Sequence, residues 1–368
     1  MQKKILFFHG LKMKDNNRKN FWKNKKILIT GHTGFKGAWT SLFLNELGAR
    51  VVGYALKPQK KNNLFLNSNL EKHIFKSYIG DILDKKKLKR ILVKTKPDII
   101  IHMAAQSLVR KSYQDPISTF NINCIGTANL LDVVRKINNI KLILVTTSDK
   151  VYDIRLKKTF TENDTLNGID PYSSSKVCQE NVVFSYFESY FKKRKSILTT
   201  RSGNILGGGD FSDNRIVPDY FRAYANNTKL KIRNQNSTRP WQHVLDAVDA
   251  YLSLIEKFYN KFNTSNEISW NVSSKNQNNM SVMKLVKSFN NLSNKSIKFI
   301  YPKKNEHSET QDLKISPKKI KKILGWENKL KTEETLKLTL SWYLKYFENK
   351  KNSYEITLNK IKNYLYLK

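Results

Sequence analysis

KILITGHTGFKG, residues 26–37, joins an apolar run to a turn in which glycine recurs at every third position. The run at 26–30 predicts a short buried strand, residues 38–47 predict a helix, and the run at 50–54 predicts the next strand. A strand, a helix and a strand in this order predict a β-α-β unit that opens a parallel sheet.

The glycine turn predicts a binding site for a dinucleotide. Glycine between a strand and a helix lets the backbone approach a diphosphate, whose charge meets the helix N-terminus. An acidic residue at the end of the second strand would bind the adenine ribose, but this chain has YALK at 54–57. That rule therefore leaves the choice between NAD and NADP open. The residues expected to hold the cofactor at the turn are Gly31, Thr33, Gly34, Phe35 and Gly37.

The rest of the chain predicts an α/β fold with a Rossmann-like, doubly wound parallel sheet. Strand-like runs recur at 98–102, 142–145 and 196–200 with helical stretches between them, and residues 270–272 resemble a late strand. After residue 204 the alternation loosens, and the glycines at 207–209 predict a flexible loop. The predicted units are an N-terminal extension at 1–20, a dinucleotide-binding domain at 21–204 with a returning segment near 240–275, and a smaller, mostly helical substrate domain at 205–368.

Composition favours a protein of a reducing compartment, the cytoplasm, that does not bind nucleic acid. The formal net charge of the 368 residues is +37, but 55 of the 67 basic residues are lysines spread along the whole chain. Such lysines are typical of solvated faces, and their field would attract an anionic substrate. The two cysteines, Cys124 and Cys178, provide no disulfide framework, which favours a reducing compartment. No apolar run approaches the roughly 20 residues of a membrane span.

Two segments 22 residues apart carry the chemistry. Tyr172 and Lys176 stand four residues apart, which places them on one face of a helix. Upstream, the apolar run at 141–145 leads into TTSDK at 146–150. A hydroxyl, a carboxylate and an amine at a strand end can project into the same cleft as the tyrosine. This combination suits the movement of a proton and a hydride on a sugar alcohol.

Seven segments, in this order and at these intervals, resemble the extended short-chain dehydrogenase/reductase family, and within it the CDP-glucose 4,6-dehydratases. The resemblance covers about 21–345 and implies a bound NAD, a CDP-hexose substrate and a homodimer formed through helices of the nucleotide domain. It also implies conversion of CDP-glucose to CDP-4-keto-6-deoxyglucose. The segments lie at 30–37, 104–110, 147–152, 170–176, 201–204, 207–210 and 239–244.

The resemblance implies a role for each residue of the predicted cleft. Tyr172 would be the base at the hydroxyl of sugar carbon 4, Lys176 would favour its phenolate and bond the nicotinamide ribose, and Ser148 would bond the oxygen at carbon 4. Asp149 would be the acid that protonates the departing hydroxyl of carbon 6, provided that burial raises its pKa.

Lys150 stands where most sugar-nucleotide 4,6-dehydratases have a glutamate. This departure is the pattern of the CDP-glucose branch. A neutral Lys150 would take the proton of carbon 5, whereas a charged Lys150 would stabilise the enolate. A salt bridge with no chemical role is the third reading.

Further contacts are expected along the cofactor and the substrate. Asp81 follows a probable strand and is either a partner of the adenine amine or an ordinary helix cap. Five of the twelve arginines lie between 201 and 239, where a planar fork would suit a diphosphate unless the clustering is chance. The cofactor contacts expected here are Asp81, Ile82, Ala104, Ala105 and Gln106, joined by Tyr172 and Lys176. The substrate contacts expected are Asn204, Arg215, Arg233 and Arg239.

The histidines predict no metal site, because no ligand spacing occurs among the six of them and the two cysteines. His102 is read as a packed side chain, and His243 as either a packed side chain or a ligand. His32 lies inside the turn and is bulky enough to crowd the cofactor. The family often shows a His-Glu pair near the C-terminus, where this chain has Ser308 and Glu309. The contact made by that histidine is therefore in doubt here.

Three other functions compete with this reading. A nucleotide-sugar 4-epimerase of the same fold needs Tyr172 and the nicotinamide but not Asp149 or Lys150, and a 4,6-dehydratase acting on another NDP-hexose needs all of them. A non-catalytic NAD-sensing or RNA-binding protein of the same fold has no need of Tyr172, Lys176 and Asp149 together.

Overall fold

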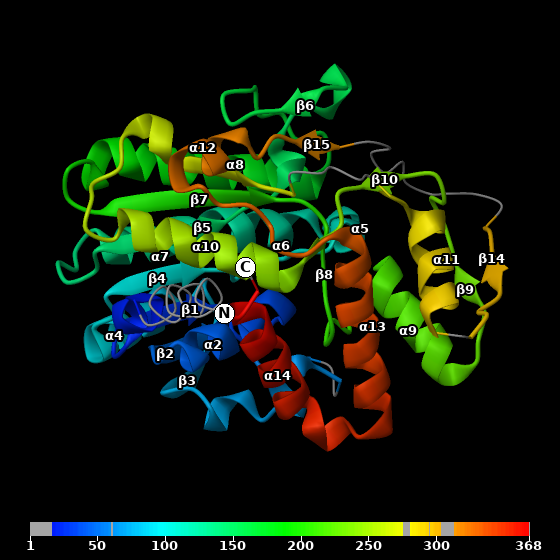
Figure 1. The fold of residues 1–368 in the computed structure, drawn as a ribbon. Coiled ribbons are helices and arrows are strands. Elements are labelled where there is room, and N and C mark those ends of the chain that lie inside the picture. The colour runs from blue at the N-terminus through cyan, green and yellow to red at the C-terminus, as the bar shows by residue number, and fades with distance from the viewer. Residues whose placement is uncertain (1–16, 60–61, 275–279, 294, 303–312, 368) are drawn as a thin grey trace, which may run out of the picture.

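A computed structural model describes residues 17–59, 62–274, 280–293, 295–302 and 313–367; Ser308 and Glu309 lie outside these ranges. Seven strands form one parallel sheet in the order β12-β7-β5-β4-β1-β2-β3 (Figure 1). The predicted doubly wound sheet is confirmed. Its strands are β1 (Lys26–Thr30), β2 (Arg50–Ala55), β3 (Lys76–Ile79), β4 (Ile99–His102), β5 (Leu142–Thr146), β7 (Ser196–Ser202) and β12 (Ser269–Val272).

The central strands are apolar on both sides because helices cover both faces of the sheet. Every residue of β4 and β5 is buried. Along β1, Ile27 and Ile29 belong to the core on one face, and Leu28 belongs to the core on the other. The strand order reverses between β1 and β4, which is where ligands bind at the carboxyl ends of such sheets.

Six helices build the two outer layers (Figure 1). On one face α2 contacts both α10 and α14, and on the other α7 contacts both α4 and α8. The first layer contains α2 (Phe35–Glu46), α10 (Val244–Phe258) and α14 (Ser353–Leu365), and the second contains α4 (Lys85–Thr95), α7 (Gly126–Val134) and α8 (Pro171–Tyr186).

A second group of elements lies beside the sheet (Figure 1). It is built on three helices and three short two-stranded ladders, while α10 and β12 return from this part of the chain to the sheet. The helices are α9 (Ile216–Asn226), α11 (Val282–Ser293) and α13 (Thr332–Glu348), and the ladders pair β8 (Ile205–Leu206) with β11 (Gln242–His243), β9 (Leu230–Lys231) with β14 (Phe299–Ile300), and β10 (Thr238–Arg239) with β13 (Met280–Ser281).

Glycines 207–209 differ from the predicted flexible loop, because all three are buried. Trp39 Nε1 donates to the carbonyl oxygen of Gly208 at 2.9 Å, and a Cβ on Gly208 would lie 2.0 Å from Cγ of Trp342. Gly208 therefore serves close packing between α2 and α13.

Both ends of the described chain are held on α10. Arg18, inside the predicted N-terminal extension, forms ion pairs with Asp249 and with Glu256, the latter at 2.7 Å. Near the other end, the hydroxyl of Tyr364 donates to Asp246 Oδ1 at 2.8 Å. Within the described ranges, no helix is both long enough and apolar enough to cross a membrane.

Candidate active site

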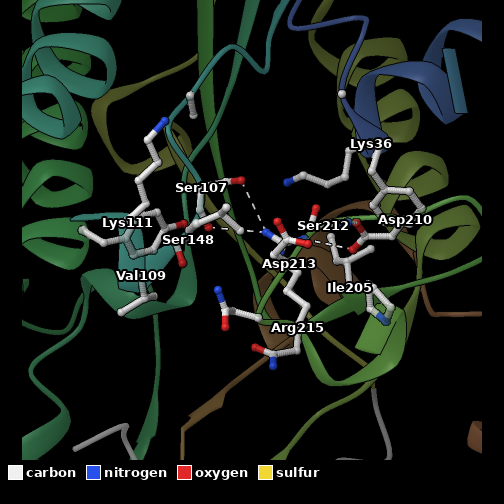
Figure 2. Close-up of a pocket in the computed structure, with 18 of the residues that line it drawn as sticks. Lys36, Ser107, Val109, Lys111, Ser148, Ile205, Asp210, Ser212, Asp213 and Arg215 are labelled. Atoms are coloured by element: carbon white, nitrogen blue, oxygen red, sulfur yellow. Dashed lines mark hydrogen bonds and ion pairs between the residues drawn. The ribbon is translucent and has the colours of Figure 1, made fainter. Parts of the chain in front are cut away.

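A cavity of about 820 Å³ lies between the carboxyl ends of the sheet strands and the second group of elements. Most of the predicted site residues line it, and Figure 2 shows Ser148 on one side of it and Lys36 and Asp210 on the other. The cofactor residues on its wall are Gly31, Thr33, Gly34, Phe35, Gly37, Asp81, Ile82, Ala104 and Ala105; the remaining predicted residues there are Ser148, Asp149, Lys150, Tyr172, Asn204, Arg215, Arg233 and Arg239.

The three glycines of the turn have different reasons to be glycine. Gly31 has φ +79°, and a Cβ there would lie 2.7 Å from the backbone nitrogen of Ala104. A Cβ on Gly37 would lie 2.2 Å from the carbonyl oxygen of Gly31, so the start of α2 packs directly on the turn. Gly34 is the exposed N-cap of α2, and its nearest contact would be Gly31 O at 3.4 Å. Gly34 therefore leaves bare backbone at a helix N-terminus, which is the cradle that a diphosphate requires.

His32 points away from the cavity, so the predicted crowding of the cofactor is wrong. Its buried ring lies over Gly53, where a Cβ would be 2.2 Å from the ring, and Nε2 bonds the hydroxyl of Ser77 at 2.8 Å. Burial lowers the pKa of His32 to about 4, so the ring is neutral. His102 is also buried, as predicted, and bonds Thr30 and Thr127.

A short turn after β5 presents three candidate catalytic side chains. Ser148 caps the 3₁₀ turn Asp149–Val151, and its Oγ accepts from the backbone nitrogen of Lys150 at 3.2 Å. The same hydroxyl donates to Asp149 Oδ1 at 3.1 Å. Facing this turn, α8 begins with Pro171, and Asp170 caps it by accepting from the backbone nitrogen of Tyr172 at 3.0 Å. Tyr172 is thus placed in the first turn of α8.

Burial is the main cause of the shifted pKa values of Tyr172 and Asp149. It raises the pKa of Tyr172 to about 12, and the neighbouring Ser148 hydroxyl and Arg215 charge oppose it in part. Burial also raises the pKa of the Asp149 carboxyl, against the opposing charge of Lys150. A carboxyl that keeps its proton to higher pH than usual is suited to act as a general acid.

Two of the predicted residues lie behind the cavity wall rather than on it. The amino group of Lys176 donates to Gln179 Oε1 at 2.8 Å and to the carbonyl oxygen of Thr146 at 3.4 Å. Burial, followed by the charge of Lys36, lowers the pKa of Lys176 to about 7. Gln106 is buried, and its side chain bonds Thr119 Oγ1 at 3.0 Å.

Three of the five clustered arginines reach the cavity. Arg215 spans it, with Nη1 at 3.2 Å from Asp210 Oδ2 and Nη2 at 3.4 Å from Ser107 Oγ (Figure 2). Arg233 Nη1 donates to Asn214 Oδ1 at 2.8 Å, and the charge of Arg239 acts on Asp149.

The other two arginines, Arg201 and Arg222, are used elsewhere in the fold. Arg222 donates to Asp219 and to the carbonyl oxygens of Phe211 and Ser212. Arg201 is buried beneath the turn that follows β5, where its guanidinium meets Glu180 with Nε–Oε1 at 3.0 Å and Nη2–Oε2 at 3.1 Å. The planar guanidinium is thus needed at Arg201, where it binds a carboxylate of the protein itself.

Glu180 was not predicted as a residue of the site. Its Oε1 also accepts from Thr147 Oγ1 at 2.6 Å, next to Ser148. Burial would raise the pKa of Glu180, but Arg201 outweighs burial and the pKa is lowered. Its spacing in the sequence could have identified it, because Glu180 follows Lys176 by four residues and Tyr172 by eight and so lies on the same face of α8.

The substitution Arg201→Met is expected to lower the free energy of unfolding by about 3–5 kcal/mol, because it leaves the Glu180 carboxylate buried and unpaired. The measurement is urea unfolding, with Lys192→Met as control. Lys192 pairs with Glu188 at 2.8 Å at the exposed end of the helical segment that begins with α8 and carries Glu180. Loss of this exposed pair should change the free energy of unfolding by less than about 1 kcal/mol. Equal losses for the two variants would contradict the structural role of Arg201.

The sequence was compared with known families and proteins. A profile of the family described as GDP-mannose 4,6 dehydratase matches residues 28–339. The CDP-glucose 4,6-dehydratase of Salmonella typhimurium is 38% identical over 332 residues, which cover 88% of this chain and 92% of that protein. The human dTDP-D-glucose 4,6-dehydratase is 29% identical over 340 residues, covering 89% of this chain and 92% of that one.

Solved structures share the fold. The dTDP-glucose 4,6-dehydratase of Bacillus anthracis, solved in complex with NAD, aligns with a TM-score of 0.74 and 23% identity over 88% of this chain and 98% of that chain. The UDP-glucose 4-epimerase of Thermotoga maritima aligns with a TM-score of 0.75 and 24% identity over 87% and 99%. Since the family profile spans most of the sequence, this chain belongs to the GDP-mannose 4,6 dehydratase family.

Proposed function

We propose that this protein is an NAD-dependent lyase that converts CDP-glucose to CDP-4-keto-6-deoxyglucose. The observation that carries the proposal is the turn that presents Ser148, Asp149 and Lys150 to the same cavity as Tyr172. An epimerase needs one proton-transferring group at carbon 4, whereas elimination of water needs a further acid and base. The 38% identity to a CDP-glucose 4,6-dehydratase supports the choice of substrate.

The cavity fits NAD at the glycine turn. Bare backbone at Gly34 faces the cavity at the N-terminus of α2, and Asp81 and Ile82 line the cavity beyond β3. When bound there, NAD supplies the acceptor and later the donor of a hydride. The residues proposed to hold it are Gly31, Thr33, Gly34, Phe35, Gly37, Asp81, Ile82, Ala104 and Ala105, with Gln106 supporting the wall from behind.

The first step proposed is oxidation at carbon 4. Tyr172 takes the proton of the hydroxyl while the hydrogen of carbon 4 leaves as hydride, so that the carbon–oxygen bond becomes a carbonyl. Ser148 donates a hydrogen bond to that oxygen. Because burial raises the pKa of Tyr172 to about 12, nearby positive charge is needed to favour the phenolate. Lys176, one helical turn away on α8, provides it.

The second step proposed is loss of water across carbons 5 and 6. The new carbonyl acidifies the proton on carbon 5, and Lys150 takes it. Asp149 gives its proton to the hydroxyl of carbon 6, which leaves as water. The hydride then returns to carbon 6, and Lys150 returns a proton, exchanged with solvent, to carbon 5, so the product differs from the substrate by the loss of one water molecule.

The substrate diphosphate and ribose are proposed to lie against Asn204, Arg215, Arg233 and Arg239 on the far wall. The cofactor would be bound by the chain up to residue 204, with the segment near 240–275 completing the sheet. The remainder would form the substrate-binding half.

The proposed function is tested by incubating the enzyme and NAD with CDP-, UDP-, GDP- and dTDP-glucose. The expected result is the alkali-sensitive chromophore of a 4-keto-6-deoxy sugar, strongest with CDP-glucose. Formation of a galactose nucleotide without that chromophore would contradict the proposal and favour the epimerase. RNA binding that falls steeply with salt, without turnover of any sugar nucleotide, would also contradict it.

A pair of glycine variants separates cofactor binding from folding. Gly34→Ala has room for its methyl group at φ −81°, so the chain should fold as the parent does. Its affinity for NAD should fall about tenfold, as for the loss of one good contact. Gly37→Ala should lower the yield of folded protein, because its Cβ would lie 2.2 Å from Gly31 O. The measurements are NAD titration and thermal unfolding, and unchanged NAD affinity in Gly34→Ala would contradict the placement of the diphosphate.

A cytoplasmic homodimer is proposed as the working form. Three mutually contacting segments expose apolar side chains: α6 (Pro116–Phe120) with Ile117 at 71% exposed, the helical turn Asn121–Ile125 with Ile125 at 49%, and α8 with Phe184 at 52%. Light scattering should give twice the chain mass, and Ile117→Asp should shift it to the monomer. A monomeric parent protein would contradict the dimer.

A further inference from the structure

A buried network of polar side chains supports Lys176 from behind. Gln179, on α8, lies between Lys176 and the neighbouring helix α7, and it is fully buried. Its Oε1 accepts from Lys176 Nζ at 2.8 Å, and its Nε2 donates to Thr127 Oγ1 at 2.8 Å. Thr127 also contacts His102 Nε2 at 3.0 Å. Gln179 has no role in the reaction as proposed above.

The proton donors in this network can be assigned one by one. The hydroxyl of Thr127 donates its only proton to the carbonyl oxygen of Asn123 at 2.7 Å, so its oxygen can only accept from Gln179 and from His102. Nε2 of His102 therefore carries the proton, and Nδ1 accepts from Thr30 Oγ1 at 2.7 Å.

This assignment fixes the orientation of the Gln179 amide. In the opposite orientation, the NH₂ group would face the amine of Lys176, and the carbonyl would face an oxygen of Thr127 that has no proton left to give. Both hydrogen bonds of a buried amide would then be lost, which is strongly unfavourable. The carbonyl dipole of Gln179 is thus held with its negative end on Lys176.

Lys176 needs such a partner. It is buried, and the charged or titratable groups around it are Lys36 on α2, His102 on β4, and Tyr172 and Glu180 on α8. Lys36 opposes the charge of the amine, and His102 is neutral. Glu180 favours the charged amine, but its carboxylate is also paired with Arg201, and burial outweighs its effect on the pKa of Lys176. A fixed carbonyl oxygen on the amine favours its charged form, as a hydrogen bond to an ionised group does.

We propose that Gln179 is a positioning residue that keeps the amine of Lys176 charged and fixed in place directly behind the cavity wall. The catalytic consequence rests on the proposed function, because it requires Tyr172 to work as a base. The hydrogen bond between Gln179 and Lys176 does not depend on that function, and the two parts are tested separately.

The first test needs no substrate. Unfolding of the unloaded protein is measured for Gln179→Met, Lys176→Met and the double variant. The two substitutions should be coupled at about pH 6, where Lys176 is charged, and much less at about pH 9, where it is neutral. Zero coupling at both pH values, or equal coupling at both, would overturn the proposal whether or not any sugar nucleotide is turned over.

The second test is the pH dependence of kcat/KM. Loss of the carbonyl in Gln179→Met should move the alkaline limb, where Lys176 loses its proton, about one unit toward lower pH. Gln179→Glu keeps an acceptor and adds negative charge, so it should move that limb toward higher pH. Thr127→Val, which removes the anchor of the amide, should shift the limb in the same direction as Gln179→Met, and it replaces that variant should Gln179→Met not fold.

Val183→Ala is the matched control. Val183 is buried on the same helix one turn beyond Gln179 and packs in the apolar core. Its truncation should lower stability and leave both limbs of the pH profile in place. A Gln179→Met enzyme that behaves like Val183→Ala, with lower activity and unmoved limbs, would show that Gln179 is merely structural.

Discussion

Tyr172→Phe is expected to lower kcat about 1,000-fold, the range of a lost general base. The substitution removes only the hydroxyl of a buried ring that lines the cavity, so folding and NAD binding should remain. The measurement is the initial rate at saturating CDP-glucose, with NAD titration on the same preparation. A kcat within about tenfold of the parent would remove Tyr172 from the first step.

The physical basis of this expectation is the charge around the phenol. Burial raises the pKa of Tyr172 to about 12, while Arg215 favours the phenolate. The active form has lost the phenol proton, so the rate should rise with pH on the acidic side of the profile, up to the alkaline limb where Lys176 loses its proton. In Tyr172→Phe this rise should vanish from any residual activity.

Tyr186→Phe provides the matched control for Tyr172→Phe. Tyr186 lies on the same helix α8 but is not part of the cavity wall, so the same loss of one hydroxyl should leave kcat unchanged. A fall comparable to that of Tyr172→Phe would attribute the effect to α8 as a whole.

Lys150→Met is the second substitution with a large expected effect. It should stall elimination and lower the rate of keto-deoxysugar formation by about 100-fold or more, because the proton of carbon 5 loses its acceptor. Oxidation at carbon 4 depends on Tyr172, so the 4-keto sugar should accumulate before water is lost. The measurement is rapid quenching followed by identification of the sugar. Unchanged turnover would remove Lys150 from the mechanism.

Lys150→Arg separates the two chemical readings of Lys150. Arginine keeps the positive charge and cannot act as a base near neutral pH. If Lys150 takes the proton, Lys150→Arg should fail as Lys150→Met does; if it only stabilises the enolate, Lys150→Arg should retain much of the activity. Lys157→Met, at an exposed position in the following loop, controls for the loss of one lysine.

The elements of the sheet could be predicted because their signals are local. The apolar runs at 26–30, 98–102 and 142–145 coincide with β1, β4 and β5. The glycine spacing and the Tyr172–Lys176 spacing are also local patterns, and the residues that they identified lie at the cavity or directly behind it.

The features that could not be predicted depend on contacts between residues that are distant in the sequence. Arg201 was counted in the arginine cluster that would suit a diphosphate, but its partner Glu180 is on another element and is revealed only when β7 and α8 pack together. Gly208 was predicted to be flexible because no residue near it in the sequence indicates that it packs against Trp342. The side chain of His32 leaves the glycine turn because Gly53, on β2, makes room for its ring.

The central claim is that one cavity oxidises a sugar at carbon 4 and then removes water across carbons 5 and 6. The most direct measurement uses CDP-glucose carrying deuterium at carbon 4, followed by a second incubation of unlabelled CDP-glucose in deuterated water. The first product should carry the label at carbon 6, and the second should carry solvent deuterium at carbon 5. Label that remains at carbon 4, in a product that keeps its hydroxyl at carbon 6, would contradict the account.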